Sequence, residues 1–117
     1  MVLAKEVVLE KMSKAHVVVL DVQPEADFEA LHIRGSHPIP LGGDPGSFAQ
    51  KVEMKFGRDK FFIVYGSSQP ALNALDAAED LRKKGLWAEA YPEGLEDWRG
   101  AGYPTEGTQA WKKADHP

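Results

Sequence analysis

The fold is constrained most by the alternation of two apolar patterns along the chain. Short runs of β-branched and aromatic residues, typical of strands, occur between segments whose apolar residues recur every three to four positions, as in helices. The runs cover 16–22, 60–65 and 87–91, with at most a short further strand at 37–39. Strands that alternate with helices imply right-handed crossovers, so we expect an α/β fold with a parallel sheet and helices on both faces.

The strongest helical pattern covers 71–84 and stops at Gly85. We expect its buried stripe to consist of Ala71, Leu72, Leu75, Ala78 and Leu81. A second helix is expected over 47–56, ending at Gly57, and shorter ones around 8–12, from Pro24 onwards and over 95–99. Glycines and prolines fall between these segments, which indicates one compact unit.

The length of 117 residues suits one domain, because a second core would leave each half marginal. We expect that domain to cover 1–104. The remaining residues, 105–117, lack apolar periodicity and are polar, so we expect them to form a flexible C-terminal tail.

The charge balance excludes several function classes. Against 18 acidic residues the chain has 14 basic ones, without a basic run that could neutralise adjacent phosphates, so nucleic acid is not expected as a partner. Apolar stretches such as 17–20 are far shorter than the roughly 18 residues of a membrane span, and residues 1–12 are too charged for a signal peptide. We therefore expect a cytoplasmic protein that does not enter a membrane.

The chain contains no cysteine. This excludes disulfides, thiolate metal sites and every mechanism with a cysteine nucleophile.

The expected site lies in the loop after the strand at 60–65. In parallel sheets, ligands bind beyond the carboxyl ends of the strands, where loops lead into helices. That loop consists of Gly66, Ser67, Ser68, Gln69 and Pro70, followed by Ala71 at the start of the long helix.

Five separated motifs resemble, in order, those of the rhodanese-like domain family. They are Leu20-Asp21-Val22, His32-Ile33-Arg34-Gly35-Ser36 with Ile39-Pro40, Ile63-Val64-Tyr65, Glu93-Gly94-Leu95-Glu96-Asp97-Trp98, and Gly102-Tyr103-Pro104. Several ordered motifs are more specific than any single one. The resemblance implies one rhodanese-like domain, with a parallel sheet of about five strands between helices.

In active rhodaneses the corresponding loop begins with a cysteine, whose thiolate takes the transferable sulfur as a persulfide. The matching position here is Gly66, which has no side chain to act as nucleophile or leaving group. The loop departs from the family in two further ways, since Pro70 removes one amide donor and Ala71 stands where a basic residue is often found. Gln23 stands where an arginine often follows the strand.

The loop residues leave other interpretations open. Gly66 could supply an unusual backbone dihedral angle, or its amide and those of Ser67 and Ser68 could hold a small anion before the helix. A serine nucleophile would need a base within reach, and no Gly-x-Ser-x-Gly elbow is present. Ser68 is instead expected to cap the helix.

Residues outside the loop are expected to be structural. The resemblance implies such roles for Asp21, His32, Gly35, Gly94 and Trp98. Asp21 ends a buried strand, so we expect it to accept hydrogen bonds from the segment 32–36. Trp98 is expected to be a packing anchor.

A metal site is the alternative for two of the histidines. His32 and His37 lie five positions apart and could be joined by Asp21 if the loop folded back. Hydrogen bonding within the loop is favoured instead, and we expect neither metal nor cofactor.

The leading hypothesis is a catalytically inactive rhodanese-like module that binds or regulates, with a small anion or a protein as its partner. The alternatives are a thiosulfate or persulfide sulfurtransferase whose nucleophile is replaced at Gly66, and a purely structural protein-interaction domain.

Overall fold

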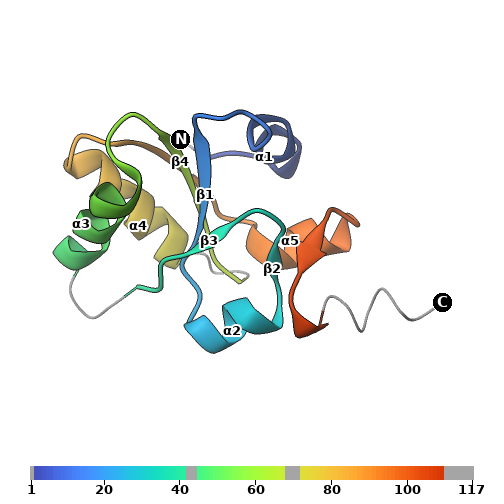
Figure 1. The fold of residues 1–117 in the computed structure, drawn as a ribbon. Helices are drawn as coiled ribbons and strands as arrows, with labels where there is room; N and C mark the ends of the chain where they lie inside the picture. Colours follow the sequence, from blue (N-terminus) through green and yellow to red (C-terminus); the bar gives the residue numbers. More distant parts are fainter. Residues whose placement is uncertain (1, 42–44, 68–71, 110–117) are drawn as a thin grey trace.

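A computed structural model describes residues 2–41, 45–67 and 72–109 of the chain. The element order is α1 (Lys5–Lys11), β1 (Val17–Asp21), α2 (Glu25–Ala30), β2 (His32–Ile33), β3 (His37–Pro38), α3 (Pro45–Phe56), β4 (Phe61–Tyr65), α4 (Leu72–Lys83), β5 (Trp87–Tyr91), α5 (Gly94–Gly100) and β6 (Thr105–Glu106). Figure 1 shows these elements as one α/β unit. The expected fold class is confirmed.

The main sheet has four parallel strands in the order β3-β1-β4-β5. About five strands were expected. At the free edge of β5, Val2 makes only an isolated bridge to Ala90, while β2 pairs with β6 in a separate two-stranded sheet. The register aligns Asp21 with Tyr65 and Tyr65 with Tyr91, so three strands end at one level.

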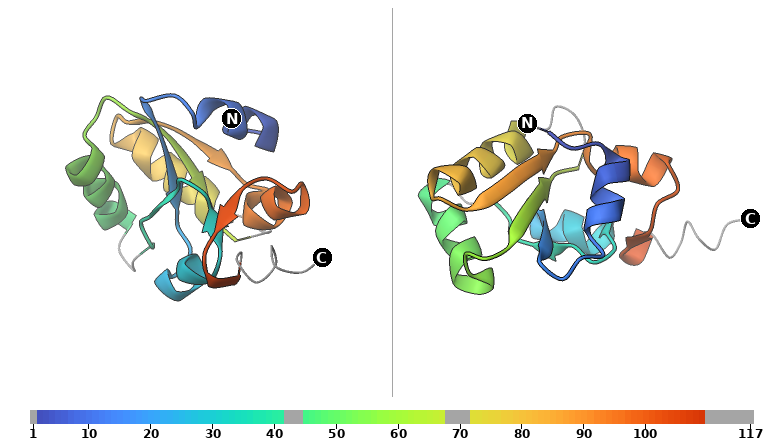
Figure 2. Two further views of the ribbon diagram at one scale, coloured as in Figure 1. Left: turned by 45° about the vertical axis from the view of Figure 1, so that its right-hand side comes forward. Right: turned by 90° about the horizontal axis from the view of Figure 1, so that it is seen from above.

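Each central strand contributes alternate residues to two cores, one on each face of the sheet. In β4, Phe62 and Val64 pack with α3 and α4, whereas Phe61, Ile63 and Tyr65 pack with α1 and α5. All five side chains of β4 are buried, as expected for a strand covered on both sides. Figure 2 shows the two pairs of helices on opposite sides of the sheet.

The buried face of α4 differs from the expected stripe. Leu75 is 37% exposed, while Ala74, Ala77 and Ala78 are fully buried together with Leu81. Both sets have helical spacing, and small alanine side chains let the helix lie close to the sheet. The side chains of Ala71 and Leu72 lie outside the described residues.

Part of the expected tail pairs with the body of the domain. Thr105 and Glu106 form β6, which pairs antiparallel with His32 and Ile33. The boundary between residues 104 and 105 thus falls at the start of a paired segment, and the division into domain and tail stays a prediction.

None of the helices among the described residues has both the length and the apolar character needed to cross a membrane.

Candidate functional site

The expected loop leaves β4 at the carboxyl end of the sheet and is fixed at its start by α5. The carbonyl of Gly66 accepts a hydrogen bond from the amide of Leu95 at 3.0 Å, and the carbonyl of Ser67 accepts one from Glu96, also at 3.0 Å. Gly66 is buried and Ser67 is exposed. The predictions for Ser68, Gln69, Pro70 and Ala71, helix capping by Ser68 included, lie outside the described residues.

Gly66 does not have the unusual backbone conformation considered as one explanation for a glycine here. Its φ is not among the positive values, and a Cβ built on it would meet only Cγ2 of Val22, at 3.9 Å. That is an ordinary van der Waals contact. The position therefore has a backbone conformation that suits residues other than glycine, and room for a Cβ among the described residues.

Gly94 is the glycine that the local backbone requires. Its φ is +72°, and a Cβ built on it would stand 2.7 Å from the carbonyl oxygen of Gly66. Only glycine combines this left-handed conformation with such a close backbone approach. The structural role expected for Gly94 thus has a defined cause: it lets the start of α5 meet the loop.

Asp21 is fully buried at the end of β1, next to the loop. Its carboxylate accepts hydrogen bonds from the backbone amide and the side-chain Nε2 of Gln23, both at 2.8 Å. The expectation that the segment 32–36 would supply these bonds directly was wrong. The amide of Gln23, two residues downstream, closes an Asx turn with the Asp21 carboxylate, and its side chain then reaches the second carboxylate oxygen. These local bonds take the place of the ones expected from the segment 32–36.

Tyr65 connects Asp21 to that segment and was missed from the sequence. Its hydroxyl bonds to Asp21 and accepts the amide of Ile33 at 2.9 Å, and it lies 2.9 Å from the Ser36 hydroxyl. Burial is the main cause that raises its pKa far above the ordinary tyrosine value, so it stays protonated. A hydroxyl at the end of an otherwise apolar strand was the available indication.

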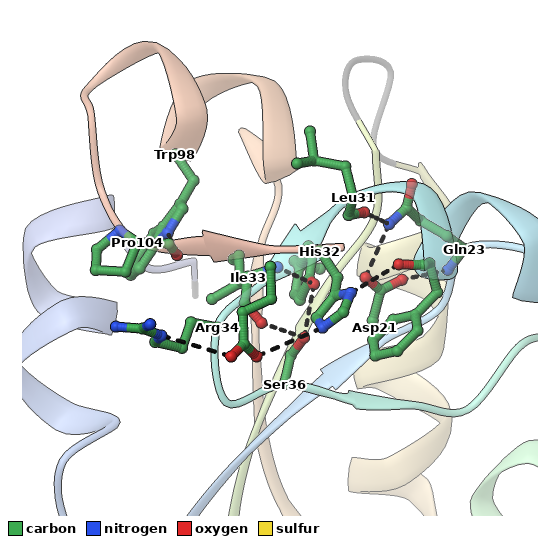
Figure 3. Close-up of polar contacts among 12 residues, drawn as sticks. Asp21, Gln23, Leu31, His32, Ile33, Arg34, Ser36, Trp98 and Pro104 are labelled. Carbon is green, nitrogen blue, oxygen red and sulfur yellow. Dashed lines mark hydrogen bonds and ion pairs between the residues drawn. The ribbon is translucent and has the colours of Figure 1, made fainter. Parts of the chain in front are cut away.

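Burial also raises the pKa of Asp21, because the charged form loses its hydration. Hydrogen bonds from Tyr65 and Gln23 oppose this shift without cancelling it. The carboxyl group is thus a buried structural acid behind the loop. Figure 3 shows it among its partners.

The other residues expected to be structural lie around this network. His32 stacks on Phe28 with ring centroids 3.8 Å apart, and its Nδ1 lies 2.7 Å from the Phe28 carbonyl oxygen. Trp98 is fully buried and donates a hydrogen bond from Nε1 to the Pro104 carbonyl at 2.8 Å (Figure 3). Gly35 has a φ of +87° and lies in the turn between β2 and β3.

Among the described residues, no group of three or more histidines and carboxylates is placed to hold a metal ion, so His32, His37 and Asp21 do not form the metal site considered above. His37 is exposed and packs edge-on against Phe56.

A cleft of about 310 Å³ opens beside Ser67. It is lined by Gln23, Asp27, Ala30, Leu31, Ser67, Leu95, Glu96, Arg99 and Gln109. The sequence did not indicate Arg99 as a site residue. Its guanidinium donates to both carboxylate oxygens of Glu96, at 3.0 and 3.1 Å, so it is already paired with a carboxylate.

Comparison with known proteins identifies one curated relative and several solved structures with the same fold. The HTH-type transcriptional regulator Rv0324 of Mycobacterium tuberculosis is 26% identical over 98 residues, which are 84% of this chain and 41% of that protein. The chain therefore spans less than half the length of this curated relative.

Solved structures share the fold at low identity. The rhodanese-like domain of the Alr3790 protein from Anabaena sp. has a TM-score of 0.78 at 20% identity, over 99% of this chain and 83% of that one. EanB, in a complex with ergothioneine covalently linked with a cysteine persulfide, has a TM-score of 0.74 at 19% identity, over 92% and 28% of the two chains. The family model described as the rhodanese-like domain matches residues 4–101. This chain belongs to the rhodanese-like domain family.

Proposed function

We propose that this chain is a catalytically inactive rhodanese-like domain that acts by binding, as a regulatory or partner-recognition module. The observation that carries the proposal is the absence of any cysteine from the 117 residues, with Gly66 in the position that matches the family's nucleophile. Without a thiolate, the chain has no group to hold a sulfur atom as a persulfide.

The backbone around Gly66 supports a retained site. The carbonyls of Gly66 and Ser67 are held by the start of α5, and a Cβ would fit at Gly66. The nucleophile is missing, while the described start of the loop, Gly66 and Ser67, is held by backbone hydrogen bonds. Recognition by a backbone frame does not need a thiol, so binding can persist without catalysis.

The charges in the cleft favour a protein segment over a free anion. Arg99 is paired with Glu96, and Asp27 adds a second carboxylate to the described lining. Among the described lining residues, an anion would thus have to depend on neutral donors such as backbone amides, hydroxyls and side-chain amides. A peptide could use both the exposed Ser67 and the half-buried methyl group of Ala30 as contacts.

The curated relative is consistent with a regulatory association. Its name describes an HTH-type transcriptional regulator, and the similar stretch lies within that longer protein. A stretch similar to this chain can thus be part of a regulator, which supports the proposal.

Sulfur transfer from thiosulfate to cyanide tests the loss of catalysis. The purified chain should give the same rate as the reaction without protein, and Gly66→Ala should give that rate too. Turnover by the unaltered chain, absent from Gly66→Ala, would overturn the proposal.

Installing the thiol tests the alternative that this is a sulfurtransferase with a replaced nucleophile. In Gly66→Cys, a thiolate can attack the outer sulfur of thiosulfate, release sulfite and keep that sulfur as a persulfide, which cyanide then removes as thiocyanate. If the loop that starts at Gly66 has diverged towards binding, this variant forms little persulfide, as measured by intact mass spectrometry. Rapid turnover by Gly66→Cys would favour the sulfurtransferase alternative.

A further inference from the structure

Gln23 has an unused hydrogen-bond acceptor at the cleft beside Ser67. The residue is only 5% exposed, yet it belongs to the cleft lining. Its side-chain nitrogen Nε2 donates twice, to Oδ2 of Asp21 at 2.8 Å and to the Leu31 carbonyl at 3.3 Å. The side-chain oxygen Oε1 accepts no hydrogen bond from any described residue.

The orientation of this side-chain amide is fixed by its two partners. Both partner atoms are oxygens, so the nitrogen has to face them, and a flipped amide would place Oε1 against the Leu31 carbonyl. Figure 3 shows Oε1 on the side of the amide that points away from Asp21. An acceptor on a buried side chain, fixed in direction and without a described partner, is a position where a ligand can donate a hydrogen bond.

The charged groups of the cleft leave one carboxylate without a counter-charge. The described lining contains the carboxylates of Asp27 and Glu96 and a single guanidinium, that of Arg99. Arg99 donates to both oxygens of Glu96. Asp27 is exposed and forms no ion pair with another described residue. Both the surplus charge and the free acceptor therefore favour a cationic donor as the ligand.

We propose that the cleft binds the guanidinium of an arginine side chain in a peptide segment of the partner, an assignment that rests on the binding function proposed above. A guanidinium has five N–H donors, no acceptor and a permanent positive charge. One of its donors can meet Oε1 of Gln23 while the charge is attracted to Asp27. Arg99 repels such a ligand, but Glu96 offsets this effect.

The size and polarity of the cleft exclude other occupants. Its volume of about 310 Å³ lies at the lower end of the roughly 300–1,000 Å³ of small-molecule sites, so it suits one side chain. A carboxylate ligand would be repelled by Asp27 and could not donate to Gln23. A neutral amide ligand could donate to Gln23 but would gain no charge attraction.

Titration of the full chain with short peptides, followed by NMR, tests the proposal. The peptides are Gly-Ala-Xaa-Ala-Gly, acetylated and amidated, in which Xaa is arginine, citrulline or glutamate. Citrulline nearly keeps the shape of arginine but has no charge. The arginine peptide should bind several-fold more tightly than the other two, shift the side-chain amide signals of Gln23, and lose affinity with added salt.

Three variants place the ligand in the cleft. Asp27→Asn should weaken binding of the arginine peptide several-fold. Glu25→Gln is its matched control, because it removes a carboxylate from the same first turn of α2 but outside the described lining, and it should leave the affinity nearly unchanged. Arg99→Gln should tighten binding several-fold, since it removes a cation and releases Glu96. A gain of affinity cannot result from misfolding.

Equal affinities for the arginine and citrulline peptides would overturn the proposal, as would equal losses in Asp27→Asn and Glu25→Gln or weaker binding by Arg99→Gln. Failure of the arginine peptide to bind would do the same. Tighter binding of the glutamate peptide would refute the guanidinium as ligand and leave the proposed binding function in place. The loss of catalysis is decided separately by the thiosulfate assay, whose result does not depend on these titrations.

Discussion

Gly94 lies so close to Gly66 that there is no room between them for a methyl group: a Cβ built on Gly94 would stand 2.7 Å from the Gly66 carbonyl oxygen. The next amide, that of Leu95, donates to this same oxygen at 3.0 Å. The start of α5 and the start of the loop therefore behave as one unit. Any residue larger than glycine at position 94 must move one of them.

Gly94→Ala should lower the free energy of unfolding by about 2–5 kcal/mol. Alanine at a φ of +72° costs roughly 1–2 kcal/mol, and the contact with the Gly66 carbonyl adds about 1–3 kcal/mol of overpacking. Urea denaturation measures the loss.

Gly57→Ala is the matched control for this loss. Gly57 has a similar φ, +82°, but no atom lies within 4 Å of its built Cβ. It should lose only the conformational part, about 1–2 kcal/mol. If both variants lost the same amount, contact between Gly94 and the loop would not be the cause.

Gly66→Ala should be tolerated, in contrast to Gly94→Ala. The backbone of Gly66 needs no positive φ, and its Cβ would make one ordinary contact with Val22. Replacing glycine at such a position restricts the unfolded chain, so thermal unfolding should show a change between neutral and about 1 kcal/mol of stabilisation. A loss of more than about 2 kcal/mol is incompatible with this backbone conformation.

Tyr65→Phe should cost about 1–3 kcal/mol, because it leaves the buried Ile33 amide without its acceptor and removes a donor from Asp21. Tyr103→Phe removes the same atom from a half-buried ring whose hydroxyl has no hydrogen bond with another described residue, and should change stability by about 0.5 kcal/mol at most. Comparable losses in both variants, measured by urea denaturation, would argue against the network.

The sequence was sufficient for the parts of the fold that depend on local pattern. Apolar runs marked β1, β4 and β5, and a stop glycine marked the end of α3. It could not choose the buried face of α4, because Ala74 and Leu75 both satisfy helical spacing and only the packing against the sheet distinguishes them. The pairing of β6 with β2 joins two residues of each strand from distant parts of the chain, so no periodicity reveals it.

The candidate site was chosen by a topological rule, which says nothing about the contacts inside it. The rule that loops at carboxyl strand ends carry function pointed to Gly66. The central position of Tyr65 follows from the meeting of separate segments, since its hydroxyl bonds to Ile33 and Ser36 far away in the chain. The hydrogen bonds from Gln23 to Asp21 are local, but the sequence alone does not show which of several nearby donors the carboxylate takes.

Asp21 should make stability depend on pH in a defined direction. Because burial raises its pKa in the folded state, the folded chain binds this proton more readily than the unfolded chain does. The contribution of Asp21 is therefore fully present below the ordinary aspartate pKa and is lost as pH rises through the raised value. Asp21→Asn cannot titrate, so the unaltered chain should gain stability relative to this variant as pH falls from neutral, by at most about 1.4 kcal/mol per pH unit.

The quantity to measure is the difference in unfolding free energy between the unaltered chain and Asp21→Asn, followed across pH. Asp21→Asn also removes an acceptor from Gln23, but this loss shifts the difference by the same amount at every pH. Asp59→Asn removes a carboxylate from an exposed loop and shows what the loss of one charge does by itself. The opposite result is a free energy of unfolding that falls on acidification in the unaltered chain relative to Asp21→Asn. It would mean that hydrogen bonds from Gln23 and Tyr65 outweigh burial at this carboxyl group.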